Sequence, residues 1–375
     1  MPLSPANPIN SVDKKLAGLD HLRALAIVLV LLFHYRLFEH PDWIIPVGKF
    51  GWTGVDLFFV LSGYLISSQL FLKIAHGVKI SFKDFFIRRF FRIIPAYLTV
   101  VAIYFCIPYF REWEALPPLW KFLTFTQNIG LDISKTRTFS HAWSLCIEEQ
   151  FYLLFPLTLI ALTYFKFGRK GAFLIAGLFI FGFAARIFCW NHFVEPLSGK
   201  DIFPAAWYKW IYYPTWGRLD GILTGVTIAA LFQFLPTVMT RLAQYGNVLV
   251  LVSLGVLTCA YFLCEDSHSY AASIFGFPLV SLGYGILVIA AISPSCFLYR
   301  FRSLITEKLA AWSFATYLVH KGVIHLAQQL FSKHGIAANG NLMFVICFLA
   351  SLAGALILHM VIEKPFLLLR KKITG

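Results

Sequence analysis

The stretch HLRALAIVLVLLFH, which runs from His21 to His34, decides the fold of this chain. Ten apolar residues separate Arg23 from His34, so the segment has the composition of a helix inside a lipid bilayer. It nevertheless carries a guanidinium near one end and an imidazole near the other. Such groups are expensive inside a membrane and by default indicate a functional site.

The composition of the whole chain agrees with a membrane protein. Of its 375 residues 59% are hydrophobic and only 13% are charged, whereas about a quarter of a soluble domain is charged. The net charge of +14 is typical of the Lys- and Arg-rich cytoplasmic loops of membrane proteins, so we expect no nucleic-acid partner. The seven cysteines stand singly in apolar runs, without the spacing of a metal site or a disulfide framework, and we expect no metal.

Apolar segments of about 20 residues predict an all-α, polytopic transmembrane bundle. We predict ten spans, at 19–38, 55–74, 85–106, 143–165, 171–190, 211–234, 247–264, 274–292, 309–330 and 342–362. The domains are then a cytoplasmic segment 1–18, a ten-helix domain 19–365 and a basic tail 366–375. One set of loops, including 166–170 and both chain ends, carries about twice as many Lys and Arg as the other, which predicts that both termini are cytoplasmic.

This topology gathers a basic cluster at the cytoplasmic face. Arg88, Arg89 and Arg92 open the span 85–106, and Arg23 lies at the cytoplasmic end of the first span. Arg89 and Arg92 are three residues apart and share a helical face. Convergent arginines suit bidentate phosphate binding, although the same run is also typical of an ordinary positive-inside anchor. Arg23 favours phosphate binding, because an arginine within an apolar helix needs a partner.

A second polar cluster is predicted in the outer half of the bundle. His34 is a candidate general base, with Asp56 or Glu148 to orient it; the alternative is an interfacial histidine at a helix end. His141 and Glu148 open the span 143–165 from outside, where a carboxylate also complements the helix dipole. Ser144 is a plausible N-terminal cap of that helix.

The later spans add more polar residues. Arg218 and Asp220 open the span 211–234 from outside, and their separation of two residues puts them on different faces, so each is expected to pair across helices. His320 and His325 do not have the spacing of a metal-binding helix face. They and Lys321 receive no role at this stage.

These residues fall in blocks that resemble the acyltransferase 3 family of bacterial membrane O-acyltransferases. The blocks are LDHLRALAIVLVLLFHY (19–35), GWTGVDLFFVLSGYLIS (51–67), RRFFRIIPAY (88–97), HAWSLCIEEQFYLLFP (141–156), WGRLDGILTGV (216–226), SFATYLVH (313–320) and EKP (363–365). Tyr64 stands where a phenylalanine is more usual. The resemblance covers essentially the whole chain and is to the stand-alone form, without an appended hydrolase-like domain.

The resemblance implies a function. Such proteins lie in the bacterial cytoplasmic membrane and transfer an acyl group, usually acetyl, from cytoplasmic acyl-CoA to a hydroxyl of a cell-surface or lipid-linked carbohydrate. By motif, Arg23 and His34 match the family's first-helix arginine and histidine, Arg89 and Arg92 its RxxR, and Glu148 its WSLxxE glutamate. Arg23 would position the donor, and His34 would act as base with Glu148 as the first choice to orient it. Direct transfer is the simpler mechanism, and an acyl-histidine route remains open.

A proton-coupled secondary transporter or exporter is the alternative function. Intramembrane Arg, His, Glu and Asp also form proton relays. Transporters of this kind often consist of two related halves, and the sequence contains no obvious internal repeat. The resemblance therefore ranks above this alternative.

Overall fold

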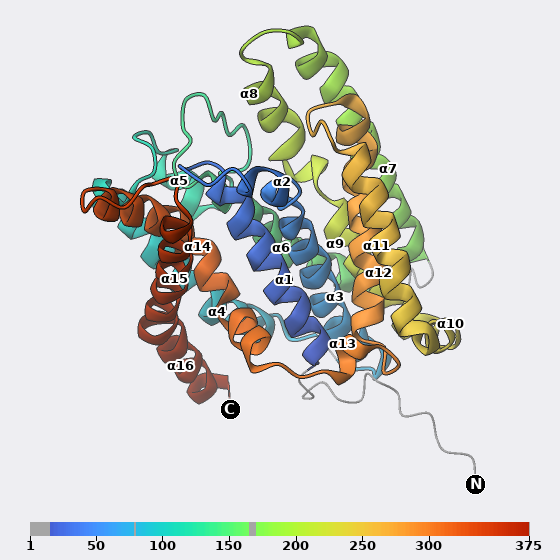
Figure 1. The fold of residues 1–375 in the computed structure, drawn as a ribbon. Helices are drawn as coiled ribbons and strands as arrows, with labels where there is room; N and C mark the ends of the chain where they lie inside the picture. The colour runs from blue at the N-terminus through green and yellow to red at the C-terminus, as the bar shows by residue number, and fades with distance from the viewer. Residues whose placement is uncertain (1–15, 79, 165–169, 375) are drawn as a thin grey trace.

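The computed structural model describes residues 16–78, 80–164 and 170–374, which form helices joined by turns and loops (Figure 1). The predicted segment 1–18 and the loop 166–170 therefore lie almost entirely outside the described residues. Among these residues, eight helical stretches are long and apolar enough to cross a membrane: 17–35, 44–75, 82–106, 140–164, 171–197, 236–263, 272–291 and 341–374. The predicted class is confirmed: this is an all-α, multi-pass membrane protein.

Two of the ten predicted spans are not among the helical stretches that are both long and apolar enough to cross a membrane. The span 211–234 becomes the helix α9 (Asp220–Phe234), which has only 15 residues because an irregular segment precedes it. The span 309–330 becomes α14 (Leu304–Ser332), which is long enough with 29 residues but more polar, since it carries two histidines and Lys321. The count of ten spans and the side of the membrane that each end faces stay predictions.

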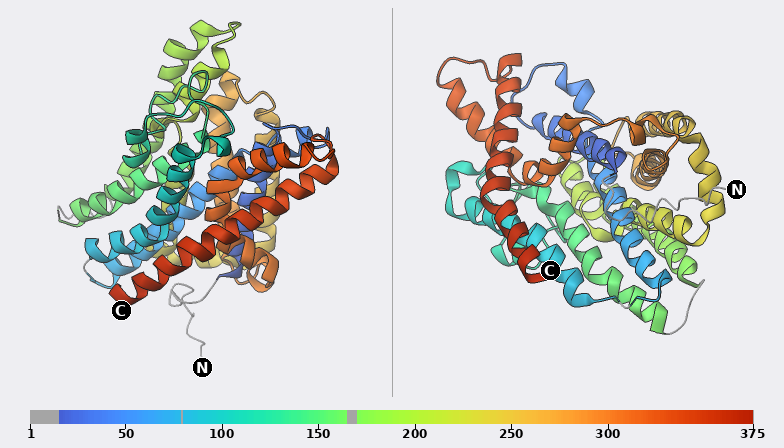
Figure 2. Two further views of the ribbon diagram at one scale, coloured as in Figure 1. Left: turned by 90° about the vertical axis from the view of Figure 1, so that its left-hand side faces the viewer. Right: turned by 90° about the horizontal axis from the view of Figure 1, so that it is seen from below.

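The central helices are α1 (Ala17–Tyr35), α3 (Thr53–Ala75), α9, α12 (Phe277–Ala291) and α14. Two groups flank them, as Figures 1 and 2 show: α7 (Gly171–Cys189) with α11 (Gly246–Leu263) on one side, and α4 (Phe82–Cys106) with α15 (Asn341–Leu358) and α16 (Lys364–Thr374) on the other. Helix α6 (Trp143–Tyr164) packs against α3. The flanking helices expose large apolar side chains such as Phe173, Leu251 and Ile357, which suits contact with lipid.

Glycines let α3 and α9 approach closely. A Cβ atom on Gly63 would overlap the carbonyl of Ile222, and one on Gly225 would overlap the carbonyl of Val60. Small residues at such crossings are typical of membrane helices, where tight packing replaces the hydrophobic drive to associate. The crossing fixes the start of α9 against the middle of α3.

Helix α4 begins at Phe82, three residues earlier than the predicted span. Ser81 caps it, since its Oγ accepts a hydrogen bond of 3.2 Å from the backbone nitrogen of Asp84. The earlier start places Arg88, Arg89 and Arg92 in the second and third turns of α4. They therefore project from a formed helix and not from its frayed end.

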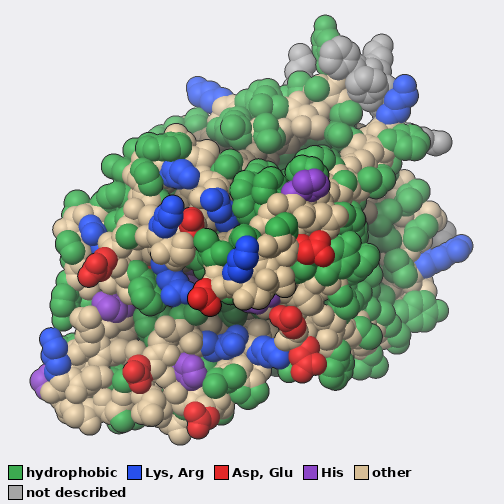
Figure 3. Space-filling model, turned by 90° about the horizontal axis from the view of Figure 1, so that it is seen from above, with side chains coloured by type: hydrophobic (Ala, Val, Ile, Leu, Met, Phe, Trp, Pro, Cys, Tyr) green, Lys and Arg blue, Asp and Glu red, His purple; other side chains and the backbone are tan. Residues whose placement is uncertain are grey.

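The two ends of the bundle differ. At one end, here called the arginine end, α1 begins, α16 finishes, and the short helices α10 (Pro236–Leu242) and α13 (Phe297–Arg300) lie (Figure 1). At the other, the loop end, lie α2 (Ile44–Gly48), α5 (Leu119–Leu123), α8 (Phe203–Trp207) and long connections. Figure 3 views the loop end, where charged side chains and histidines mingle over the face while apolar side chains dominate its flanks.

Candidate active site

A cavity of about 530 Å³, here called the arginine cavity, opens among α1, α3, α4, α6, α14 and α16. Its cationic lining residues are Arg23, Lys73, Arg88, Arg89, Arg92 and Arg370, and its acidic ones are Asp84, Glu148 and Glu149. The structure therefore brings together all four arginines that the sequence assigned to phosphate binding. It adds Arg370 from the C-terminal helix, which the sequence analysis left in the basic tail.

Few carboxylates neutralise these arginines. Within the described part of the chain, Arg23 is the only one of the five with an ion pair inside 4 Å, a loose 3.9 Å contact from Nη1 to Asp20 Oδ1. The guanidinium of Arg89 lies 5.1 Å from the ring centroid of Tyr152, so an aromatic face supports it. Guanidinium groups without carboxylate partners are available to bind anions.

Glu148 belongs to the arginine cavity. Its carboxylate accepts hydrogen bonds of 3.2 Å from Ser62 Oγ and from the Tyr152 hydroxyl. The sequence analysis expected Glu148 to orient His34, and the observed hydrogen bonds do not support that expectation. Glu148 lies in the second turn of α6, which starts at Trp143, and its bond to Ser62 shows that it faces α3.

Three histidines from three segments meet near the end of α1 that faces the loop end of the bundle. His34 comes from α1, His141 from the short 3₁₀ turn Ser140–Ala142, and His320 from α14. The ring centroids are 4.9 Å apart for His34 and His320, 4.8 Å for His141 and His320, and 5.7 Å for His34 and His141. Of these, His34 keeps 8% of its surface exposed, while His320 is fully buried. These residues are called the histidine cluster.

The hydrogen bonds of the cluster indicate the tautomers of His320 and His34 for neutral rings. His320 Nδ1 lies 3.1 Å and 2.9 Å from the carbonyl oxygens of Thr316 and Tyr317, and since carbonyls only accept, this nitrogen must donate. In a neutral ring, His320 Nε2 is then an acceptor for His34 Nδ1, which lies 3.1 Å away. His34 therefore holds its proton on Nδ1 and presents an unprotonated Nε2. The group that orients His34 is an imidazole, where the sequence predicted a carboxylate.

Tyr317 stands between the histidine cluster and the arginine cavity. Its hydroxyl donates to the backbone carbonyl of His141 at 2.5 Å and lies 2.6 Å from Ser144 Oγ. Both Tyr317 and Ser144 line the arginine cavity. Ser144 is thus bonded across to α14, and its hydroxyl does not cap α6 as the sequence suggested. The hydroxyl pair is the point of contact between the two parts of the site.

On the other side of the cluster, Lys321 forms a buried ion pair with Glu112. Lys321 Nζ lies 2.8 Å from Glu112 Oε1, and both side chains are 1% exposed. The same carboxylate oxygen accepts a hydrogen bond of 3.1 Å from the backbone nitrogen of Phe139. Burial alone would raise the pKa of Glu112, but the Lys321 ammonium holds that pKa below its ordinary value. The pair ties the connection after α4 to the residue that follows His320.

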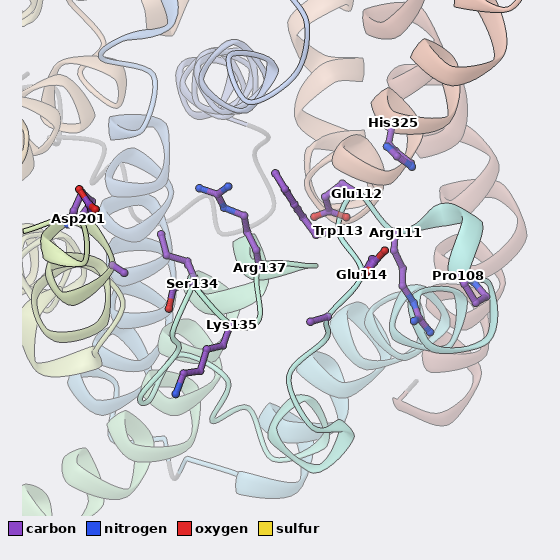
Figure 4. Close-up of a pocket in the computed structure, with 14 residues that line it drawn as sticks. Pro108, Arg111, Glu112, Trp113, Glu114, Ser134, Lys135, Arg137, Asp201 and His325 are labelled. Carbon is purple, nitrogen blue, oxygen red and sulfur yellow. The ribbon is translucent and has the colours of Figure 1, made fainter.

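Glu112 also lines a second cavity, of about 940 Å³, which opens at the loop end and is here called the loop-end cavity (Figure 4). It is polar: its charged lining residues are Arg111, Glu112, Glu114, Lys135, Arg137 and Asp201, with His325 and Trp113 beside them. The Arg137 guanidinium lies 4.8 Å from the ring centroid of Trp113. Among the described residues, the two cavities share no lining residue, and none of the three histidines lines either of them. The cluster is linked to the arginine cavity through Tyr317 and to the loop-end cavity through the pair of Lys321 and Glu112.

Three predicted site residues lie elsewhere. Both carboxylate oxygens of Asp56 accept from Arg218 Nη2, at 2.8 Å and 2.9 Å, and Asp220 pairs with Arg186 of α7. The expectation that Arg218 and Asp220 pair across helices is confirmed. These side chains are almost fully buried. Asp56 is therefore committed to Arg218, and the structure does not bring it to His34.

Residues that the sequence analysis left without a role complete the site. They are His320, Lys321, Tyr317, Glu112 and Arg370. The first two carried a signal, a histidine and a lysine inside an apolar helix, but no partner could be named from one sequence. Glu112 carried none, because it is one of several charges in a long connection. Among the described residues, no group of His, Cys, Asp or Glu is arranged to hold a metal ion.

Comparison with known proteins identifies the family of this chain. The sequence profile of a family described as an acyltransferase domain matches residues 16–360. O-acetyltransferase OatA of Staphylococcus aureus (strain NCTC 8325 / PS 47) is 26% identical over 379 residues, covering 95% of this chain and 57% of the relative. The putative O-acetyltransferase SACOL0978 of S. aureus (strain COL) is 27% identical over 335 residues, covering 84% of this chain and 51% of the relative.

The chain thus spans little more than half the length of these curated relatives. No solved structure matches it. The family match includes the whole histidine cluster and the arginines of α1 and α4. The resemblance read from the sequence blocks is confirmed, and the chain belongs to the acyltransferase 3 family.

Proposed function

We propose that this chain is an O-acetyltransferase of the bacterial cytoplasmic membrane, which moves acetyl from acyl-CoA to a hydroxyl of a carbohydrate. One observation carries the proposal. The buried histidine cluster is linked through Tyr317 to a cavity rich in arginines, and through Lys321 and Glu112 to a polar cavity at the opposite end of the bundle. Two substrates that arrive from opposite ends can meet there.

The arginine cavity suits the phosphates of coenzyme A, which carry several negative charges and accept bidentate hydrogen bonds. The eleven residues from Arg23 to His34 span about 16 Å along α1. An extended pantetheine arm bridges a distance of this order. With its phosphates near Arg23 and Arg89, the donor would deliver its thioester past Ser144 and Tyr317 to the histidine cluster.

The chemistry needs a base and a proton donor, and His34 serves as both in turn. His34 Nε2 takes the proton from the acceptor hydroxyl while the oxygen attacks the thioester carbonyl. A C–O bond forms, the C–S bond breaks, and the coenzyme A thiolate leaves with the proton that His34 returns. His320 holds the ring of His34 in the required tautomer throughout. Transfer is direct in this scheme and needs no acyl-enzyme.

The loop-end cavity suits a carbohydrate acceptor. Its carboxylates, Glu114 and Asp201, and its basic side chains offer hydrogen bonds to sugar hydroxyls, and Trp113 offers an aromatic face. His141 Nδ1 is buried without a partner among the described residues, and it faces the same cluster. It is available to accept a hydrogen bond from the acceptor hydroxyl as that group approaches His34.

The test is mass spectrometry of glycans from cells that lack the protein, complemented with the wild type or with His34→Ala. The wild type should restore an acetyl ester, and His34→Ala should lower the rate of transfer by about 10²–10⁴-fold. His40→Ala is the matched control, because His40 bonds only locally to Pro41 in a loop. Labelled acetyl-CoA supplied to the purified protein then identifies the donor.

Three outcomes decide between the parts of the proposal. Full restoration by His34→Ala would remove the base assignment. Esters other than acetyl would change the acyl group but keep the mechanism. If no acyl ester changes while the flux of a solute does, a proton-coupled transporter is the correct function.

A further inference from the structure

The C-terminal helix α16 reaches the arginine cavity although its sequence resembles an ordinary basic tail. It continues from α15 through the π-helical turn His359–Glu363, and the views in Figure 2 show this long helix running to the arginine end. α16 packs along α4, where the ring centroids of Phe91 and Phe366 are 6.3 Å apart. The family match ends at residue 360, before this helix begins.

Only one basic residue in the last turns of α16 lines the cavity. Arg370 lines it and is partly buried, whereas Lys371 and Lys372 are exposed and are not among its lining residues. A helix turns by about 100° per residue, so consecutive residues point in different directions. The packing of Phe366 against α4 therefore selects Arg370, four residues later on the same face, as the side chain that enters the cavity.

Arg370 joins two arginines of α4 at the mouth of the cavity. Arg88 and Arg92 are exposed and four residues apart, so they share a face, and Arg370 experiences the charge of both. Asp84 lines the same mouth, yet within the described residues none of these three arginines has an ion pair inside 4 Å. Three like charges held together repel one another, and an anion bound among them relieves the repulsion.

We propose that Arg370, together with Arg88 and Arg92, binds the 3′-phosphate of coenzyme A, so that α16 completes the donor site. The inference rests on the proposed acyl-CoA donor. The 3′-phosphate and the thioester are at opposite ends of coenzyme A, with the two other phosphates between them. The thioester belongs at the histidine cluster, and Arg89 lies against Tyr152, whose hydroxyl is bonded to Glu148. Arg88, in the second turn of α4, and Arg370, near the end of α16, lie toward the arginine end of the bundle. The arginines at the mouth of the cavity are therefore placed to bind the 3′-phosphate, at the end of coenzyme A opposite the thioester.

The experiment measures binding of coenzyme A and of 3′-dephospho-coenzyme A to the full chain in nanodiscs. Discs of phosphatidylcholine alone keep anionic lipid headgroups away from the mouth arginines. Arg370→Ala should weaken coenzyme A binding by about 10-fold and leave 3′-dephospho-coenzyme A binding nearly unchanged. Arg89→Ala should weaken both ligands to the same extent. Lys371→Ala and Lys372→Ala are the matched controls and should change neither.

The outcomes separate this inference from the function on which it rests. If the wild type binds no coenzyme A, the donor proposal fails and this inference falls with it. If the wild type binds and Arg370→Ala binds equally well, the role of α16 is overturned while the donor proposal stands. If Arg370→Ala weakens both ligands equally, the assignment to the 3′-phosphate is wrong. An unchanged melting temperature of Arg370→Gln checks that the helix remains folded.

Discussion

The protein contains two groups of arginines that differ in their partners. Arg186 and Arg218 are fully buried, and each is paired with an aspartate. The Arg218 guanidinium also lies within 6 Å of the rings of Trp52, Trp143, Tyr212 and Phe277. Arg89, Arg92 and Arg370 line a cavity, and in the described structure they have no ion pair inside 4 Å.

The difference separates structural arginines from binding arginines. A guanidinium that already donates its hydrogen bonds to a carboxylate has few N–H groups free for a ligand. It stabilises the contact between the two helices that carry the pair. A guanidinium that faces a cavity without such a partner is stabilised when an anion arrives. The residue type is the same in the two groups, so the partner decides the role.

The largest effect is expected when a structural pair is broken. Asp56→Ala leaves Arg218 charged and buried without a carboxylate, which should destabilise the fold by about 3–5 kcal/mol. The melting temperature and the yield of folded protein in detergent measure this. The double variant Asp56→Leu, Arg218→Met removes both charges and should recover much of the loss. A stable Asp56→Ala protein without activity would instead make Asp56 a residue of the reaction.

An intermediate effect is expected when a binding arginine is removed. Arg92→Ala should weaken acyl-CoA binding by about 1.5–3 kcal/mol, the range for hydrogen bonds to charged groups. Its melting temperature should stay at the wild-type value or rise, because a like charge near Arg88 and Arg370 is gone. A large loss of stability would place Arg92 in the structural group and contradict the comparison.

The pair of Glu112 and Lys321 lies between the two groups, since it is buried like a structural pair but adjoins a cavity. Because the pKa of Glu112 is lowered, its ionised form stabilises the fold fully above its ordinary pKa of 4.5, and this stabilisation is lost as the pH falls through the lower folded value. Glu112→Gln should lower stability by about 1–2 kcal/mol at pH 7. Melting curves should show the difference from the wild type shrinking below pH 4.5.

The smallest effect is expected when a carboxylate is added to the arginine cavity. Gln69 lines this cavity, and Gln69→Glu brings a negative charge toward the arginines. Stability should rise by no more than about 1 kcal/mol, the range for an exposed ion pair, while acyl-CoA binds a few-fold more weakly. Gln69→Leu is the control for the loss of the amide. Unchanged affinity for the glutamate variant would mean that the charge of the cavity does not govern binding.

Much of the fold could be predicted because a membrane helix requires a long run of apolar residues, which is visible in the sequence. Runs of apolar residues located every long helix, and the depth of Arg23, Arg89 and Arg92 grouped them correctly. Boundaries were less certain: α4 begins earlier than its apolar run because a serine caps polar turns that extend beyond it. The span at α9 was predicted too long, since apolar and aromatic residues also fill the irregular segment before it.

The partners of charged residues could not be predicted from one sequence. Asp56 and Glu148 were both candidates for His34, because each lies in a polar turn at a similar depth. The structure commits Asp56 to Arg218 and gives His34 the ring of His320, a contact between residues 286 positions apart. Such pairings depend on how helices rotate against each other, and composition contains no information about rotation.

Tyr317 has an electrical consequence beyond its hydrogen bonds. A bacterial membrane stores a proton gradient, and any water-filled passage from one face to the other would discharge it. Here the arginine cavity reaches Tyr317 and Ser144, and the loop-end cavity reaches Glu112. The two cavities share no described lining residue, and the three imidazoles between Tyr317 and Lys321 pack together and are buried. If acetyl crosses at this point, only the acetyl group passes between the packed side chains. The rest of each substrate stays in its own cavity, and no continuous water path forms. The same side chains that bring the reactants together would then keep the membrane charged.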